Sequence, residues 1–274
     1  LWIVLCMNVS AGIGIIGAAA PMLQETFGGA LIGHSDLGFA DLKKDEALLA
    51  LAAAVGAGFV GLISLFNIFG RFFWASISDK LGRKLTYIVF FTLGILMYVT
   101  ASYMAGSKSL ALFAACFCII ASMYGGGFAT IPAYLADMFG TQFVGAIHGR
   151  ILTAWSTAGI LGPVIVNYMH DMRVEAQVPF SEIYAPIFYI LASMLAIGFI
   201  ANLMVRPVDK KFFMTDKELL AEKKLAHEKF ISTKETFGKA EKTPLISFLA
   251  WSAVGIPISY GIWSTIQKAW ILFH

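Results

Sequence analysis

Charged residues are scarce in this sequence. Only 14% of its 274 residues are charged, whereas 58% are hydrophobic, and the mean hydropathy is +0.76. A soluble domain has about 25% charged residues, so this chain has too few of them to cover a water-facing surface. The composition excludes an ordinary soluble globular protein and indicates a protein that lies in a membrane.

Metal-ligand patterns and enzyme motifs are also lacking. Cys6, Cys116 and Cys118 lie in apolar runs without CxxC or metal-ligand spacing, which predicts small buried side chains. The sequence contains no nucleophile elbow, no P-loop and no HExxH motif. We therefore expect no metal, no cofactor and no enzymatic activity.

Long apolar stretches are what the sequence has instead. A helix of about 20 apolar residues crosses a bilayer and satisfies its own backbone hydrogen bonds there. Seven stretches have about this length, and they cover approximately residues 2–22, 50–74, 85–105, 110–132, 148–168, 184–204 and 245–270. We therefore predict an all-α membrane protein with a bundle of six transmembrane helices and one extra helix.

Small residues recur at helical spacing in three of these stretches. Such residues let neighbouring helices approach closely in a membrane. The residues concerned are Ala53, Ala57 and Gly61 in the second stretch, Gly125–Gly127 in the fourth, and Gly159 and Gly162 in the fifth. The pattern favours a compact bundle.

The basic residues predict the orientation. The loop at 79–84 has three of them, and so does the segment 206–211 after the sixth stretch. Basic loops mark the cytoplasmic side of a membrane. We therefore predict a multi-pass protein of the inner or plasma membrane with a cytoplasmic N-terminus. The loops at 23–49, 106–109 and 169–183 are then expected to face outward.

The loop between the second and third stretches carries a specific pattern. Gly82 permits a tight turn, and Asp79 can pair with the neighbouring basic residues. The segment resembles the loop signature of the major facilitator superfamily, G-x-x-x-D-[RK]-x-G-R-[RK], with Ala75 in place of the first glycine. The resemblance implies a gating loop formed by Asp79, Lys80, Gly82, Arg83 and Lys84. An ordinary basic cytoplasmic loop is the alternative.

Arg150, near the start of the fifth stretch, is a further candidate for the gate. It lies close to the predicted cytoplasmic side, where it could pair with Asp79. An interfacial anchor is the alternative interpretation of this residue.

Arg71 lies within the second apolar stretch. Asp79 follows eight residues later, or roughly 12 Å along a helix that rises 1.5 Å per residue. Half of the hydrocarbon core measures about 15 Å, so we expect Arg71 to lie well inside the membrane. An unpaired charge at that depth costs at least several kcal/mol.

An anionic ligand is the expected partner of Arg71. The acidic residues of this chain fall in loops, at the ends of spans or in the linker, and none is expected mid-span. A guanidinium stays protonated and offers a planar fork that fits a carboxylate. We therefore predict that Arg71 binds an anionic substrate in a central cavity, with Asn67 one helical turn earlier. The alternative is an arginine that snorkels to the interface or binds backbone carbonyls.

Further motifs resemble one family within that superfamily. The segments that carry this second resemblance are Asn67–Lys84, Tyr124–Pro132, Ala136–Gly140, His148–Gly149, Thr153–Trp155 and Gly162–Pro163. With these segments, residues 1–206 look like the C-terminal six-helix half of the oxalate/formate antiporter family. The resemblance implies that Arg71 binds a substrate carboxylate and that aromatic residues line the cavity. It also implies a missing N-terminal six-helix half, as expected if the chain is truncated before Leu1.

Three aromatic residues complete the candidate site. Tyr124 and Phe128 fall at two of the family's aromatic positions, although Phe128 lacks the hydroxyl found in oxalate carriers of the family. Trp155 stands where those carriers have a second cation, a lysine. One cation suits one carboxylate better than two, so we predict a monocarboxylate substrate and a wall at Trp155. A lipid-facing or core position is the alternative for each of these aromatic residues.

The chain is predicted to have three parts: a transporter bundle at 1–206, a charged cytoplasmic linker at 207–243 and an accessory transmembrane helix at 244–274. The last part resembles the one-helix small subunit found with some carriers of the family. In the linker, Thr215 and Glu218 form a capping box that predicts a helix.

The predicted function is secondary transport of small carboxylate anions, such as formate, lactate or pyruvate, by alternating access. The expected partners are the carboxylate, the lipid bilayer and the missing half, with no nucleic acid. The alternative is a non-transporting membrane subunit or sensor built on the same bundle.

Overall fold

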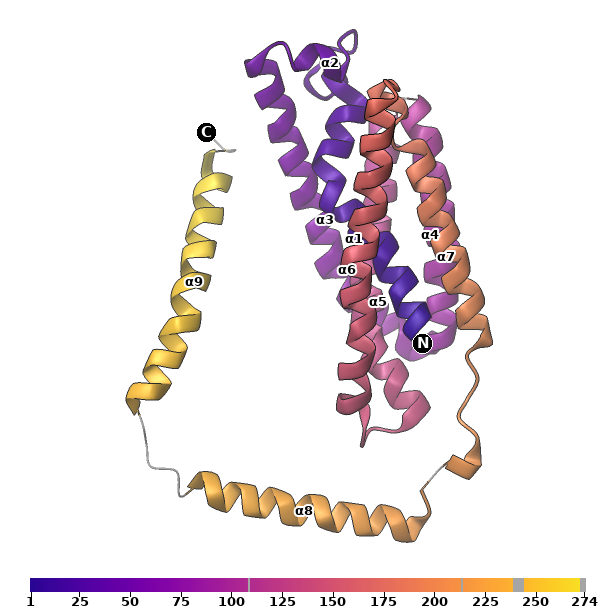
Figure 1. Ribbon diagram of the computed structural model, residues 1–274, viewed down its shortest axis with the longest axis vertical. Coiled ribbons are helices and arrows are strands. Elements are labelled where there is room, and N and C mark those ends of the chain that lie inside the picture. The colour runs from indigo at the N-terminus through magenta and orange to yellow at the C-terminus, as the bar shows by residue number, and fades with distance from the viewer. Residues whose placement is uncertain (108, 213, 239–243, 272–274) are drawn as a thin grey trace. The chain divides into compact units, whose positions relative to one another are not determined.

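The computed structural model describes residues 1–107, 109–212, 214–238 and 244–271, and every regular element in these segments is a helix (Figure 1). The long helices are α1 (Trp2–Phe27), α3 (Glu46–Leu81), α4 (Arg83–Ser107), α5 (Leu110–Phe139), α6 (Val144–Glu175), α7 (Ala185–Met204), α8 (Asp216–Gly238) and α9 (Pro244–Ile271). The short ones are η1 (Gly28–Ile32), α2 (Phe39–Leu42), η2 (Phe180–Glu182) and η3 (Lys210–Phe212).

The chain divides into two compact units. The first, Leu1–Val208, contains the helices from α1 to α7, and the second, Asp209–His274, contains η3, α8 and α9. In the second unit, the predicted capping box is present at the start of α8. The backbone N–H and the hydroxyl of Thr215 each lie 2.8 Å from Oε2 of Glu218, and the N–H of Glu218 donates back to that hydroxyl.

The predicted fold class is confirmed. Six helical spans of the first unit are long and apolar enough to cross a membrane: those of α1 with η1, α3, α4, α5, α6, and α7 with η2. The extra helix predicted near the C-terminus is α9, whose described apolar stretch runs over Ser247–Pro257. That stretch is shorter than the bilayer core requires, so a membrane crossing by α9 stays a prediction.

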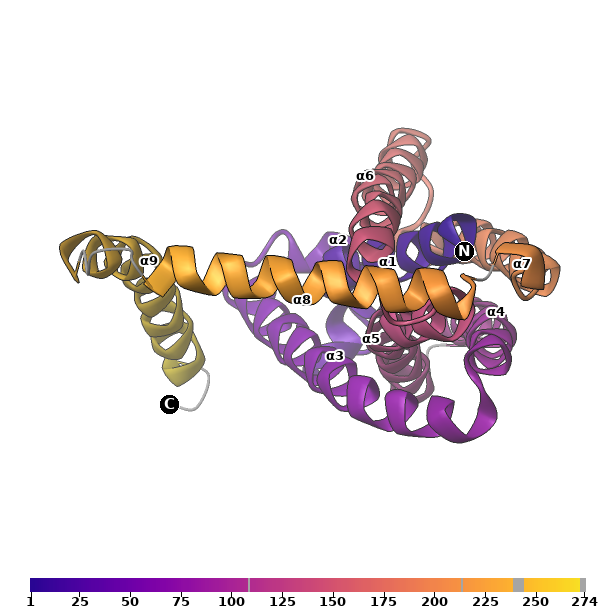
Figure 2. The ribbon, with the colours of Figure 1, turned by 90° about the horizontal axis from the view of Figure 1, so that it is seen from below.

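Within the first unit, α1 and α5 form the centre of the bundle. The end-on view of Figure 2 shows them between α3, α4, α6 and α7. The central helices are the most buried of the six spans, whereas α3 and α6 are the least buried. Apolar side chains of α3 such as Phe69 and Phe72 are therefore exposed in this unit.

Glycines set the close contacts between α3 and α5 and between α1 and α6. A Cβ added to Gly125 would lie 2.2 Å from the carbonyl oxygen of Asn67, and one added to Gly162 would lie 2.4 Å from that of Ser10. The prediction for Gly125–Gly127 and Gly162 is thus confirmed. Gly61 and Gly159 make no such contact within the described part of the chain, because a Cβ there would meet nothing within 4 Å.

The remaining small residues of the second predicted span also face away from the bundle. Ala53 and Ala57 are exposed, and the buried positions of α3 are one residue earlier, at Ala52 and Gly56. Spacing alone identifies a face of small residues, but it does not say which neighbour that face meets.

Several helices extend beyond the apolar stretches. Helix α1 continues to Phe27, and α6 continues to Glu175, so that part of the loop predicted at 169–183 is helical. Hydropathy marks the hydrocarbon core, whereas a helix can continue past it on polar residues. The turn predicted at 106–109 includes residue 108, which lies outside the described residues.

Candidate functional site

Arg71 and Asn67 lie one turn apart on α3. Nη2 of Arg71 donates a hydrogen bond of 3.3 Å to Oδ1 of Asn67. The side chain of Arg71 is exposed on the surface of the first unit, ten residues before the end of α3 at Leu81. The two residues that the sequence assigns to one helix face therefore contact each other.

The backbone of α3 is fixed against α5 on both sides of this pair. A Cβ at Gly70 would lie 2.2 Å from the carbonyl oxygen of Ser122, and a Cβ at Gly125 would lie 2.2 Å from that of Asn67. Separations this short leave room for no side chain other than hydrogen. The position of Arg71 relative to α5 is thus set by glycine contacts directly beside it.

Aromatic side chains of α5 and α6 lie next to Arg71. Its Cζ is 6.0 Å from the centre of the Phe128 ring, which in turn lies 6.2 Å from the Trp155 ring. Nε1 of Trp155 donates to the hydroxyl of Tyr124 at 3.4 Å. The structure thus brings all five predicted substrate residues together. We call Asn67, Arg71, Tyr124, Phe128 and Trp155 the Arg71 cluster.

The charge of Arg71 is not balanced within this cluster. Among the described residues, no carboxylate oxygen lies within 4.0 Å of its guanidinium. The guanidinium has five N–H donors, and one of them is directed at Asn67. The face of Phe128 adds a cation–π contact but no countercharge. The cluster can therefore accept a planar anion without displacing an internal acid.

The predicted gating loop forms a tight turn between α3 and α4. Gly82 has a φ of 85°, a value that favours glycine, and its N–H donates to the carbonyl of Ser78. Arg83 donates to Ser78 and Asp79, and its Nε lies 3.5 Å from Oδ2 of Asp137 at the end of α5. These contacts connect the ends of α3, α4 and α5.

Lys84 extends this connection to α7. Its Nζ donates to the carbonyls of Leu203 at 3.0 Å and Val205 at 2.6 Å. Asn202 in turn donates to the carbonyl of Lys84. The basic loop thus satisfies carbonyls at the C-terminal end of α7, which have no partner within the helix.

The structure places the other two gate candidates apart from these contacts. Lys80 is exposed at the end of α3. Arg150 lines a pocket of about 390 Å³ together with residues such as Trp2 and Phe139, and Asp79 forms its ion pair with Arg83 instead. The suggested pairing of Arg150 with Asp79 is not present.

A second polar cluster was missed by the sequence reasoning, which placed no acid inside a span. Glu25 is only 9% exposed near the end of α1, within the apolar span Trp2–Ile32. Its Oε2 contacts Nε2 of His170 at 2.9 Å and accepts a bond of 2.7 Å from the hydroxyl of Tyr184. Nδ1 of His170 lies 3.1 Å from Oδ1 of Asp171. We call these four residues the Glu25 cluster.

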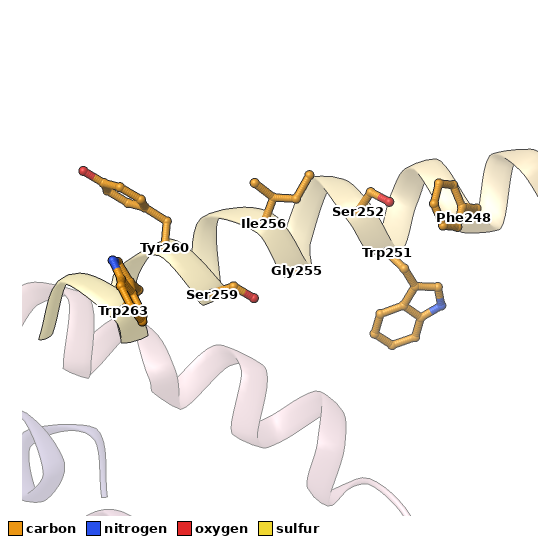
Figure 3. A pocket seen from close by; sticks show the side chains of 8 residues that line it. All are labelled: Phe248, Trp251, Ser252, Gly255, Ile256, Ser259, Tyr260 and Trp263. Atoms are coloured by element: carbon orange, nitrogen blue, oxygen red, sulfur yellow. The ribbon is translucent and has the colours of Figure 1, made fainter. Parts of the chain in front are cut away.

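A shallow hollow lies along one side of α9, in the second unit. Figure 3 shows its lining, which includes Phe248, Trp251, Tyr260 and Trp263 around the small residue Gly255. None of the lining residues is charged, so this surface is no candidate for anion binding. Exposed Trp251 and Trp263 agree with the apolar character expected of a membrane-associated helix; Trp270 has no described side chain.

The fold and the Arg71 cluster define a class: a multi-pass helical membrane protein with an unbalanced cation on one face of its bundle. The chain belongs to the Major Facilitator Superfamily, whose family model matches residues 1–270. Members of this superfamily are transporters rather than enzymes.

Two curated relatives match parts of the chain. It is similar to a protein named oxalate:formate antiporter from Oxalobacter formigenes, with 34% identity over 114 residues, which are 42% of this chain and 27% of that protein. It is also similar to the glucose transporter GlcP of Staphylococcus epidermidis, with 28% identity over 161 residues, which are 56% of this chain and 32% of that protein. The matches thus span about a quarter to a third of these relatives.

Proposed function

We propose that this chain is the C-terminal half of a secondary carrier for small carboxylate anions, of the oxalate/formate antiporter type, and that Arg71 binds the carboxylate. The observation that carries the proposal is a guanidinium with no acid partner among the described residues, held beside Asn67 and Phe128 within a predicted span. A permanent charge in hydrocarbon needs a counterion, and here the substrate provides it.

This charge also argues for an anion over a sugar. A neutral hexose is recognised through hydrogen bonds to its hydroxyls and gives Arg71 no countercharge. The name of one relative, an oxalate:formate antiporter, agrees with an anionic substrate, whereas the name of the other, a glucose transporter, does not. Glucose therefore belongs in the test as the competing substrate.

The number of cations indicates one carboxylate per substrate. Trp155 and Arg71 both lie about 6 Å from the Phe128 ring, and the indole of Trp155 donates to Tyr124 rather than supplying a charge. A second carboxylate placed there would lose its water without gaining an ion pair. Formate, lactate and pyruvate are therefore proposed as substrates ahead of oxalate.

The proposed mechanism is alternating access. Carriers of this type move a midplane site between two six-helix bundles that rock against each other. We assign residues 1–206 to one bundle, 207–243 to a cytoplasmic linker and 244–274 to an accessory membrane helix. The loop at 79–84 connects four helix ends and is the proposed hinge region on the cytoplasmic side.

Uptake by the full-length protein tests the proposal. The protein is reconstituted in vesicles, and the entry of labelled formate, lactate, pyruvate, oxalate and glucose is measured. Arg71→Ala should reduce monocarboxylate uptake by about 100-fold, because it removes hydrogen bonds to a charged ligand worth roughly 3 kcal/mol. Arg206→Ala is the matched control, because Arg206 is an exposed arginine outside the Arg71 cluster.

Each result has a definite reading. Carboxylate uptake that survives Arg71→Ala would refute the role of Arg71. Uptake of glucose but not of carboxylates would refute the substrate class. Binding of a carboxylate without any flux would favour the non-transporting subunit or sensor.

A further inference from the structure

The Glu25 cluster joins three helical segments at one end of the first unit. Glu25 comes from α1, His170 and Asp171 come from α6, and Tyr184 directly precedes α7. The ring of His170 also stacks near that of Tyr184, with 5.6 Å between their centres. The Arg71 cluster uses none of these residues, and the gating loop does not contact them.

The hydrogen-bond geometry determines how many protons this cluster needs. Both ring nitrogens of His170 lie within hydrogen-bond distance of carboxylate oxygens, at 2.9 and 3.1 Å. A neutral imidazole has one N–H, so its other nitrogen would direct a lone pair at an ionised carboxylate. One added proton, on His170 or on Glu25, converts both contacts into hydrogen bonds.

The cluster also provides a route from water to a buried acid. The exposed fraction of the side chain falls from 74% at Asp171 to 24% at His170 and 10% at Glu25. Each step between them is a direct contact of about 3 Å. A proton from water can therefore reach Glu25 through the imidazole, and the charge of the three groups changes from −2 to −1. The loops at this end are the ones that the sequence predicts to face outward.

Neighbouring charged groups do not neutralise the cluster. Arg173 donates through Nη2 to the carbonyl of Glu182 at 3.1 Å, and no described carboxylate oxygen lies within 4.0 Å of it. Lys43, beside α2, has its Nζ 4.7 Å above the ring of Phe180. From α4, the hydroxyl of Ser102 lies 3.5 Å from the carbonyl oxygen of Ala185, directly after Tyr184, and adds no charge. An added proton is therefore what allows both contacts of His170 to be hydrogen bonds.

Helix α6 links this cluster to the Arg71 cluster. His170 follows Trp155 by 15 residues, or roughly 22 Å along the helix. Between them, Gly162 packs directly on α1, so these two helices are in contact along the intervening turns. A change in the contact between Glu25 and His170 therefore acts on the helix that carries one wall of the substrate site.

We propose that the Glu25 cluster is a proton-binding site and that its proton enters together with the carboxylate. The binding of the proton stands on the geometry of the cluster alone, whereas its coupling to transport rests on the proposed function. Entry of one proton with one monocarboxylate moves no net charge across the membrane.

The first test measures the proton directly. Nitrogen chemical shifts of labelled histidine in the full-length protein report whether each ring nitrogen carries a proton, and His170→Gln identifies the signal of His170. At about pH 6, we expect both nitrogens of His170 to be protonated in the wild type. A neutral imidazole with Glu25 ionised would overturn the site, whatever the protein transports. Infrared spectra of wild type and Glu25→Gln show whether Glu25 holds the proton instead, which would support it.

The second test measures coupling in vesicles. Acid outside should raise accumulation of a monocarboxylate by about tenfold per pH unit if one proton enters with it. Glu25→Gln and His170→Gln should lose this stimulation and retain exchange of labelled for unlabelled substrate at equal pH. Tyr184→Phe, which keeps the ring and removes one hydrogen bond to Glu25, should reduce the stimulation less. His34→Gln is the matched control, because His34 is an exposed histidine at the same end.

The outcomes separate the two proposals. Stimulation by acid that persists in both Glu25→Gln and His170→Gln would overturn coupling at this site. So would a wild type that transports monocarboxylates without stimulation by acid. Absence of carboxylate transport would refute the proposed function, while the histidine spectra would still decide whether the site binds a proton.

Discussion

The Arg71 cluster and the Glu25 cluster differ in the kind of charge they hold. The first has a permanent cation, Arg71, and no acid of the described part of the chain contacts it. The second has two acids around a histidine, whose imidazole can bind a second proton. In our proposal the first binds an anion from solution, whereas the second binds a proton that lowers its negative charge from −2 to −1. The two clusters thus have different proposed ligands, an anion and a proton. Helix α6 contributes to both clusters, through Trp155 and His170.

The largest effect is expected when an acidic residue is placed beside Arg71, because the Arg71 cluster then has a countercharge of its own. Phe128→Glu would put a carboxylate near the guanidinium, at the position of a ring now 6.0 Å away. The new ion pair competes with the substrate, so we expect monocarboxylate uptake to fall by about 100-fold or more, or roughly 3 kcal/mol. Phe128→Gln, whose side chain has the shape of glutamate without its charge, should lose much less of the uptake. Equal losses in the two variants would show that Arg71 needs no external anion.

A change in packing between α3 and α5 should disturb the Arg71 cluster and leave the Glu25 cluster unchanged. Gly125→Ala places a Cβ 2.2 Å from the carbonyl of Asn67, so α3 must move away from α5. We expect a loss of stability of about 1–3 kcal/mol and weaker monocarboxylate uptake, with His170 still protonated in the histidine spectra. Gly159→Ala is the matched control, because its Cβ meets nothing within 4 Å. Equal stability of the two variants would contradict the close contact of α3 with α5.

A second cation should sharpen the substrate preference. Trp155→Lys adds a second charge beside the Phe128 ring, where a second carboxylate could bind. We expect the ratio of oxalate to formate uptake to rise about tenfold, because one charge-assisted hydrogen bond is worth roughly 1.5 kcal/mol. Trp155→Phe controls for loss of the indole. An unchanged ratio in Trp155→Lys would contradict the assignment of a monocarboxylate.

The smallest effect is expected at the start of α8, where the carboxylate of Glu218 accepts hydrogen bonds from Thr215 on the exposed surface. Hydrogen bonds from the backbone N–H and the hydroxyl of Thr215 lower the pKa of Glu218 from its usual value. Because the pKa of Glu218 is lower in the folded chain, the capping box fully stabilises the first turn of α8 at pH values above the pKa that Glu218 has in the unfolded chain. The stabilisation is lost as the pH falls through the folded pKa. Thr215→Ala should speed hydrogen exchange of that turn by about two- to fivefold at neutral pH. The same rate in both proteins would contradict a stabilising cap.

The Arg71 cluster was largely predictable because its residues are local or carry a family pattern. Asn67 with Arg71, and Tyr124 with Phe128, are pairs four residues apart on one helix, where side chains share a face. Trp155 was identified by resemblance, since no periodicity links α6 to α3. The fold followed from hydropathy in the same way, because hydrocarbon admits few alternatives to a helix.

The Glu25 cluster was not predictable from the same signals. Glu25 is separated from His170 by 145 residues and from Tyr184 by 159, so no spacing rule connects them. Hydropathy also ended the first and fifth spans before these residues, although both helices continue. Such a cluster depends on which helices become neighbours, and this is decided by packing around glycines such as Gly14 and Gly162 rather than by composition.

The contacts of Lys84 have a mechanical consequence. The carbonyls of Leu203 and Val205, which Lys84 binds, lie just before the point where the chain leaves the bundle. A force on the linker is therefore transmitted to α4 through the ammonium group of Lys84 before the last turn of α7 can unwind. The same lysine belongs to the proposed hinge loop, so tension in the linker and movement of the hinge act on a single side chain.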